Sequence, residues 1–270
     1  MRRNKNASET ETAARRLTES ALFESTLPFG TPDLMRVSAF QRYLEELERE
    51  DARSSTRMSA LSPSLMQDLM RFERGEGAGE GPDLIEVLAA AVRHARNLLV
   101  HLQNSDRVLP LSVFPVERLA HCPLRIDQLL AGPLDGLTVL HVEPAVLRPP
   151  GDRERTLVGE AELYTPLAPL LWQLALRGGR DELLPEIAGS TAYRVAPGLD
   201  LRGLPMNNAL AAAILRLQRQ TTNLREIAEW PGLDRPLAMR LLNGLYLQAG
   251  LIVSHAHPAA TNESWLSGGR

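Results

Sequence analysis

The side chains best suited to bind a metal are the six histidines and the single cysteine of the chain. His255 and His257 stand two residues apart, which places both on one side of an extended chain, and His121 directly precedes Cys122. No second conventional ligand spacing such as HExxH or CxxC accompanies them. The sequence therefore predicts no metal site, and we expect His255 and His257 to lie in a solvent-exposed tail.

Cys122 is also a candidate nucleophile, with His121 as its base. Both fall in a predicted helix over residues 116–130, where neighbouring side chains point about 100° apart, so His121 is poorly placed to take the thiol proton. The serine motifs GxSxG and SxxK are absent. Carboxylate pairs such as Asp181 and Glu182 are ordinary on a protein surface. No catalytic residue is predicted.

A cofactor that carries phosphates would need a glycine-rich turn between a strand and a helix, such as GxGxxG. The glycine-rich stretch over residues 75–81 includes Glu76 and Glu80, whose charges repel phosphate, and no strand-like run precedes it. Its composition is that of a flexible linker. The sequence therefore predicts no cofactor and places a domain boundary at this stretch.

Composition and charge exclude several classes of protein. With 44% apolar and 23% charged residues, a chain of 270 residues can build a sizeable core in one or two domains. The net charge of −3 gives no overall attraction to nucleic acid or anionic lipid, so such binding would need a local patch. A lone cysteine indicates a reducing compartment. We expect a cytoplasmic protein without a signal peptide or a membrane span.

The chain divides into four regions by composition and apolar spacing. The first is polar and partly disordered, with short tethered helices and the linker at its end. Its helices are expected over residues 13–22, 34–47 and 65–72. The four regions are a polar segment over 1–81, a mixed α/β body over 82–205, a helical module over 206–254 and a flexible tail over 255–270.

In the body, Asp83 and Glu86 have capping-box character before apolar residues at helical spacing, which predicts a helix over 84–103. His94 and His101 would then lie on similar sides of one helix. Two strand-like runs and the helix between them predict a β-α-β unit whose strands share a small sheet. The expected elements are strands over 108–114, 137–142 and 192–196 and helices over 116–130, 167–176 and 181–187.

The module over 206–254 has clear helix signals. After a helix over 210–220, Asn223 with Glu226 caps a short helix, and Asp234, with a proline in the first turn, begins a longer helix that ends near Gly250. A β-branched run over 251–253 predicts a strand. The expected fold class is therefore α+β and rich in helix.

This order of elements resembles the winged-helix and helix-turn-helix modules of bacterial regulators. The resemblance implies that the helix beginning near Arg235 is the recognition helix. It covers residues 208–254 and is carried by Leu224, Ile227, Ala228, Leu233, Ala238, Leu241, Leu242, Leu245 and Gly250–Leu251–Ile252.

The outward face of this recognition helix is the candidate binding surface. Arginine and asparagine read base edges, whereas methionine and tyrosine suit a protein partner. Residues 200–255 hold six arginines against four acids, a net charge of +2, which is small for a DNA-binding surface. We assign to partner binding Met239, Arg240, Asn243 and Tyr246, all expected to face outward.

Three functions stay open at this point. The favoured one is a non-enzymatic regulatory or adaptor protein that binds protein partners. The alternative is a DNA-binding transcriptional regulator that uses Arg235, Arg240 and Asn243. The third is an enzyme of an unrecognised family, because a shape alone does not establish a function.

Overall fold

A computed structural model describes residues 34–51, 67, 83–150 and 161–261 of the chain. These residues form a mixed α+β fold with two antiparallel sheets, in agreement with the expected fold class. The helices expected over 13–22 and 65–72 and the linker over 75–81 fall outside the described residues, apart from residue 67.

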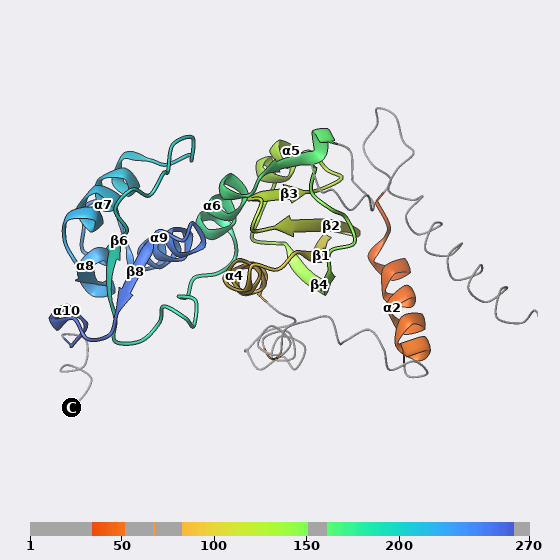
Figure 1. Cartoon of the computed structure of the whole chain (residues 1–270), viewed down its shortest axis with the longest axis horizontal. Coiled ribbons are helices and arrows are strands. Elements are labelled where there is room, and N and C mark those ends of the chain that lie inside the picture. Colours follow the sequence, from red (N-terminus) through yellow and green to blue (C-terminus); the bar gives the residue numbers. More distant parts are fainter. Residues whose placement is uncertain (1–33, 52–66, 68–82, 151–160, 262–270) are drawn as a thin grey trace, which may run out of the picture.

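The larger sheet is built from β1 (Leu98–Asn104), β2 (Arg107–Phe114), β3 (Leu119–His121), β4 (Thr138–Pro144) and β5 (Tyr164–Pro166). Around it lie α2 (Val37–Asp51), α4 (Leu84–His94), α5 (Ile126–Ala131), the short 3-10 helix η2 (Ala161–Leu163) and α6 (Leu167–Arg177). The smaller sheet contains β6 (Ala192–Val195), β7 (Thr222–Asn223) and β8 (Leu251–Ser254). It is accompanied by α7 (Asn208–Arg219), α8 (Leu224–Ala228), α9 (Arg235–Leu247) and α10 (Pro258–Thr261). The strand orders are β4-β1-β2-β3-β5 and β7-β6-β8 (Figure 1).

Helix α4 begins as predicted, because the Asp83 carboxylate accepts hydrogen bonds from the backbone N–H groups of Ile85 and Glu86. It ends at His94, where Ala95 adopts a left-handed conformation with φ of 50°. The predicted continuation to residue 103 is wrong, since residues 98–104 form β1.

The central strand β1 was missed because its leucines also fit a helical spacing. Its inward positions Leu98, Val100 and Leu102 alternate, as a strand requires, and all three are buried. The pairing that fixes them comes from β2 on one side and β4 on the other. His94 and His101 therefore do not share a helix.

The strands predicted over 108–114 and 137–142 do share a sheet, but β1 lies between them and all neighbours are antiparallel. The predicted β-α-β unit is therefore wrong. In place of one helix over 116–130, the chain makes a turn, the strand β3 and the short helix α5. The helix expected over 181–187 is also wrong, because that segment contains turns. The helix over 167–176 and the strand over 192–196 are confirmed as α6 and β6.

The C-terminal helices begin where their caps predict. The Asn223 carboxamide accepts a hydrogen bond from the N–H of Glu226, and the Asp234 carboxylate accepts one from the N–H of Leu237. The expected strand after α9 is confirmed as β8. Strand β6 pairs with both β7 and β8, so the smaller sheet joins residues on the two sides of the expected boundary between 205 and 206.

Helices α6 and α9 pack closely against one another and join the two sheets (Figure 1). At their crossing, a Cβ added to Gly244 would lie 3.1 Å from the ring of Trp172. The Trp172 indole N–H donates to the carbonyl of Pro205 at 2.8 Å. This close contact makes the helix pair part of one hydrophobic core.

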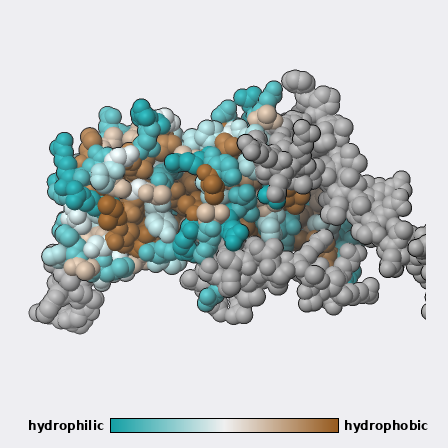
Figure 2. Space-filling view, in the orientation of Figure 1, coloured by the Kyte–Doolittle hydropathy of each residue, from teal (hydrophilic) through white to brown (hydrophobic). Residues whose placement is uncertain are grey.

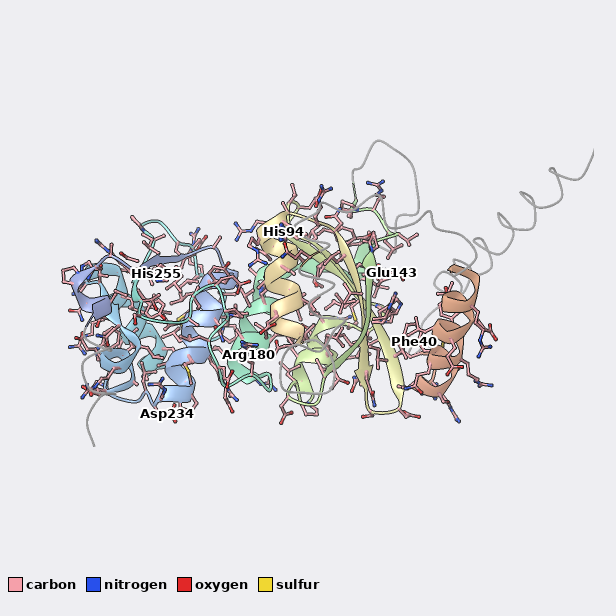
Figure 3. The ribbon with its side chains drawn as sticks, turned by 90° about the horizontal axis from the view of Figure 1, so that it is seen from below. Phe40, His94, Glu143, Arg180, Asp234 and His255 are labelled. Carbon is pink, nitrogen blue, oxygen red and sulfur yellow. The ribbon has the colours of Figure 1, made fainter. Side chains whose placement is uncertain are left out.

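Helix α2 is attached to the larger sheet at its first turns. The N–H of Val37 donates to the carbonyl of Asp106, the N–H of Val108 donates to the carbonyl of Met35, and the Arg107 guanidinium donates to the carbonyl of Leu34. Phe40 is buried, with its ring 4.6 Å from that of His101 (Figure 3). Residues 34–40 are thereby part of the folded body.

In the expected tail, residues 258–261 form α10, where the Asn223 side chain donates to the carbonyl of Ala259. The exposed surface seen in Figure 2 has its apolar residues in separate patches among polar ones. Within the described ranges, no helix is both long and apolar enough to cross a membrane.

Candidate functional site

The four residues predicted to form a binding surface on α9 are not all exposed to solvent. Asn243 is only 1% exposed. Its carboxamide oxygen accepts from the N–H of Leu184 at 2.9 Å, and its NH2 donates to the carbonyl of Glu182 at 2.8 Å. The prediction that Asn243 faces outward is therefore wrong, because residues 178–190, which we call the strap, cover this side of α9.

Arg240 is held by the strap and by the end of α6. Its guanidinium forms an ion pair with Asp181 at 2.7 Å and donates to the carbonyl of Leu176 at 3.2 Å. Met239 and Tyr246 are half-buried and pack against the core. Tyr246 also lines a small cavity of about 220 Å³ with residues of α4. Among the predicted DNA-contacting residues, Arg235 is exposed, whereas Arg240 and Asn243 already have partners within the chain.

The strap links α4 to α9 through charged groups. Arg180 lies within 2.7 Å of Glu86 and 3.3 Å of Asp83 on α4, and it also donates to the backbone carbonyls of Glu182 and Leu183 (Figure 3). Its guanidinium is largely buried, so these carboxylates offset its desolvation. Arg240 and Asn243 therefore hold the strap against α9, which is a structural role.

The cysteine and histidine candidates are also placed by the structure. Burial raises the pKa of Cys122 to about 12, so its thiol is protonated at neutral pH and is a poor nucleophile. His255 is exposed, but the Nδ1 of His257 accepts a hydrogen bond from the N–H of Ala259 at the start of α10. Across the described residues, no group of three or more His, Cys, Asp or Glu side chains could hold a metal ion.

His101 and His121 make the folded state sensitive to acid. Burial lowers the pKa of His121 to about 4, and burial together with the charge of His141 lowers that of His101 to about 4, from 6.5. Between about pH 4 and pH 6.5, the unfolded chain therefore binds more protons at these two histidines than the folded chain does. The free energy of unfolding is therefore not reduced by these histidines above about pH 6.5, and it falls as the pH drops from 6.5 toward 4.

Replacing His121 by phenylalanine should therefore make stability less dependent on pH. Phenylalanine can retain the contact with Tyr164, whose ring lies 4.8 Å away, and it has no proton to gain. We expect the acid-induced decrease in the free energy of unfolding to be smaller by on the order of 1–3 kcal/mol. Urea unfolding at a series of pH values measures this difference. The matched variant His255→Phe, at an exposed site, should keep the parental slope. An unchanged slope in His121→Phe would contradict this assignment.

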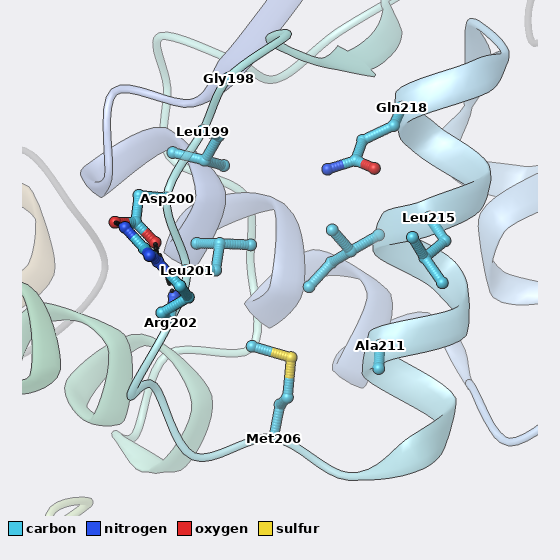
Figure 4. A pocket seen from close by; sticks show the side chains of 10 residues that line it. Gly198, Leu199, Asp200, Leu201, Arg202, Met206, Ala211, Leu215 and Gln218 are labelled. Carbon is cyan, nitrogen blue, oxygen red and sulfur yellow. Dashed lines mark hydrogen bonds and ion pairs between the residues drawn. The ribbon is translucent and has the colours of Figure 1, made fainter.

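A different surface, formed by α7 and the preceding loop, is open to solvent. This α7 groove has a volume of about 730 Å³ (Figure 4). Leu215, on its α7 side, is 54% exposed. The lining consists of Gly198, Leu199, Asp200, Leu201, Arg202, Met206, Ala211, Ile214, Leu215 and Gln218.

Both walls of the α7 groove are fixed by the fold. On one side, Asn207 caps α7 by accepting from the N–H of Leu210 at 2.8 Å. On the other, the Leu199 side chain packs over Gly250, in the space that a side chain at residue 250 would enter. The bond from Trp172 to Pro205 fixes the end of the same loop. The groove is therefore a preformed feature.

The rim of the α7 groove carries more positive than negative groups. Arg202 makes a bidentate contact with Asp200, at 2.9 and 2.7 Å, and this hydrogen bonding lowers the pKa of Asp200. The charge of Arg118 adds to this effect. Arg194 donates to the backbone carbonyl of Gln218 at 3.5 Å, which places a further cation beside the groove.

An apolar lining with polar groups at the rim can accept apolar side chains of another polypeptide. The sequence prediction missed the α7 groove because its walls are a loop and a helix that meet only in the fold. Its one sequence signal is the run of Leu199, Leu201, Leu204 and Met206 within a segment rich in glycine and proline. No family model, curated protein or solved structure matches this chain. The assignment of the α7 groove as a candidate site is therefore based on its geometry.

Proposed function

We propose that this chain is a non-enzymatic regulatory or adaptor protein that binds protein partners, and that the α7 groove is its main binding surface. The observation that carries the proposal is the exposure of Leu215 beside an apolar, preformed groove. Leaving such a side chain in water gives up free energy that a bound partner would recover. Recognition would follow the helix-in-groove mode, in which aliphatic anchors of a partner enter an apolar channel.

The structural surroundings of α9 favour protein binding over the DNA-binding alternative. A recognition helix must present its polar face to the major groove. Arg240 is paired with Asp181, and the Asn243 carboxamide is bonded to the strap, so neither is free to read a base. The resemblance of residues 208–254 to a winged-helix module remains part of the proposal as a description of shape. We propose that this module positions the α7 groove.

The proposal predicts that Leu215→Glu weakens the capture of partner proteins. A carboxylate in the apolar lining would have to be desolvated on binding, which should weaken capture about tenfold or more. Because Leu215 is exposed, the melting temperature should stay close to that of the parent. The measurement is affinity capture from nuclease-treated lysate with the full chain as bait.

The matched control is Val146→Glu, which places the same charge at another exposed apolar residue. It should capture the same proteins as the parent. If Leu215→Glu and the parent recover the same partners equally, the α7 groove is not the binding surface. If nuclease removes the whole signal and the parent binds DNA in a salt-sensitive manner, the DNA-binding alternative takes precedence.

A further inference from the structure

We propose that the α7 groove selects acidic polypeptide segments, and that Arg194 and Arg219 bind their carboxylates. This inference rests on the proposed function, because it names the chemical class of partner that the same groove accepts. It is carried by two exposed arginines that have no acidic partner among the described residues, by their position at one end of the groove and by the apolar lining beside them.

The arginines of the C-terminal part differ in whether the chain already supplies a partner. Several are engaged within the fold: Arg202 with Asp200, Arg216 with the ring of Trp230, Arg225 with Glu229 and Arg240 with Asp181. Arg194 and Arg219 are both exposed, and neither forms an ion pair with an acid that the structure describes. The positive charges of these two residues are therefore available to a ligand.

Arg194 and Arg219 lie at the end of the groove that is marked by Gln218. The Arg194 guanidinium, from β6, donates to the backbone carbonyl of Gln218 at 3.5 Å, and Arg219 is the next residue of α7. Arg219 also follows Leu215 by one helical turn, so it lies on the side of α7 that Leu215 occupies. Cations from two different elements therefore flank this end of the apolar lining.

The surroundings of these arginines leave the local charge positive. Helix α7 contains two arginines and no acid. The negative end of its dipole is equivalent to about half a charge, which is less than the charges of Arg194 and Arg219 together. The acid in the groove lining, Asp200, is already paired with Arg202 (Figure 4). A carboxylate would therefore be attracted to this end of the groove.

The apolar lining favours a polypeptide over a nucleic acid. The lining includes Leu199, Leu201 and Ile214, which can pack against the apolar side chains of a bound segment. The carboxamide of Gln218 points from α7 toward the loop that holds Leu199, where it can form hydrogen bonds to a bound main chain (Figure 4). Nucleic acids are held mainly by many cations along the phosphate backbone. Apolar anchors beside carboxylates match both the lining and the two arginines.

The test begins with selection from a displayed library of random peptides, with the full chain as bait. Peptides that bind the parent but not Leu215→Gln are retained, because they depend on the α7 groove. The neutral glutamine is used here so that the substitution itself does not repel acidic peptides. We expect the retained sequences to combine aliphatic or aromatic anchors with Asp or Glu. One acidic peptide is then synthesised with a fluorophore, and its affinity is measured by fluorescence anisotropy.

Arg194→Gln and Arg219→Gln should each weaken binding of this peptide about two- to fivefold, and the double variant about tenfold, with melting temperatures near that of the parent. Arg235→Gln is the matched control and should bind like the parent. Arg235 is also exposed, but it lies near the other end of α7, where Gly232 is in contact with Ala209. Raising the salt from about 0.1 M to about 1 M should weaken the parent more than the double variant, because the Debye length falls from about 10 Å to about 3 Å.

Exchange of charges tests the contact directly. Arg219→Glu should lose affinity for the acidic peptide and gain affinity for a version in which lysine replaces the acids. A selection that yields no peptide dependent on Leu215, or yields neutral or basic ones, overturns the inference. An acidic peptide that binds the double variant as tightly as the parent also overturns it.

Two further results separate this inference from its alternatives. A DNA duplex that binds the parent more tightly than the peptide does, and is lost in the double variant, would assign Arg194 and Arg219 to nucleic acid instead. The proposed function is tested separately, by lysate capture with Leu215→Glu. If that capture depends on Leu215 but is unchanged in the double variant, the proposed function stands and the selection of acidic segments is wrong.

Discussion

Replacing Trp172 by alanine should lower the free energy of unfolding by about 3–5 kcal/mol. Trp172 is fully buried where α6 crosses α9, with its ring against Gly244. The substitution removes this ring and leaves a cavity that the neighbouring helices can only partly close. It also removes the donor to the Pro205 carbonyl. Urea unfolding followed by far-UV circular dichroism measures the loss.

Trp172→Phe serves as the matched control, because it retains much of the ring volume but not the N–H. Its loss should be smaller, about 1–3 kcal/mol, reflecting the unpaired carbonyl of Pro205 and the missing part of the indole. A Trp172→Ala variant that loses less than about 1 kcal/mol would contradict the view that this crossing joins the two sheets into one core.

Asn243→Ala should give the second large effect, a loss of about 2–4 kcal/mol. The substitution leaves the N–H of Leu184 unpaired, and an unpaired buried polar group costs about 1–3 kcal/mol. It also removes one of two hydrogen bonds to the carbonyl of Glu182, which still accepts from Arg180. Amide exchange at Leu184 should accelerate, because this bond protects its N–H. Urea unfolding and hydrogen exchange report the two effects.

The control for this prediction is Asn208→Ala at the exposed start of α7, which should change the free energy of unfolding by less than about 0.5 kcal/mol. Equal losses in the two variants would show that the bonds to the strap contribute little. A large loss at Asn243 without faster exchange at Leu184 would assign the effect to packing alone.

The sequence was informative where interactions are local. The caps at Asp83, Asn223 and Asp234 bond to N–H groups two or three residues away, so the residues that set these helix starts are visible in a short stretch of sequence. The buried face of α9 was also predictable, since Leu241 and Leu242 lie three or four positions from Ala238 and Leu245, and all four are fully buried.

The sequence failed where the deciding partner is distant. Asn243 reads as an outward polar residue on α9, but the N–H that it binds belongs to a residue 59 positions away. The leucines of β1 fit a helix until β2 and β4 pair with them. One wall of the α7 groove includes Leu199, which packs over Gly250 from a loop about 50 residues earlier in the chain. Tertiary packing supplied each of these features.

The attachment of α2 has a consequence for the order in which a newly synthesised chain folds. Arg36 bridges to Arg107, so the strand that receives this segment leaves the ribosome about 70 residues after it. At about 5–20 residues per second, the segment waits several seconds before its docking site exists. During that interval Phe40 has no aromatic neighbour on the sheet to cover it. A chaperone or an early-binding protein would therefore meet this helix before the rest of the molecule does.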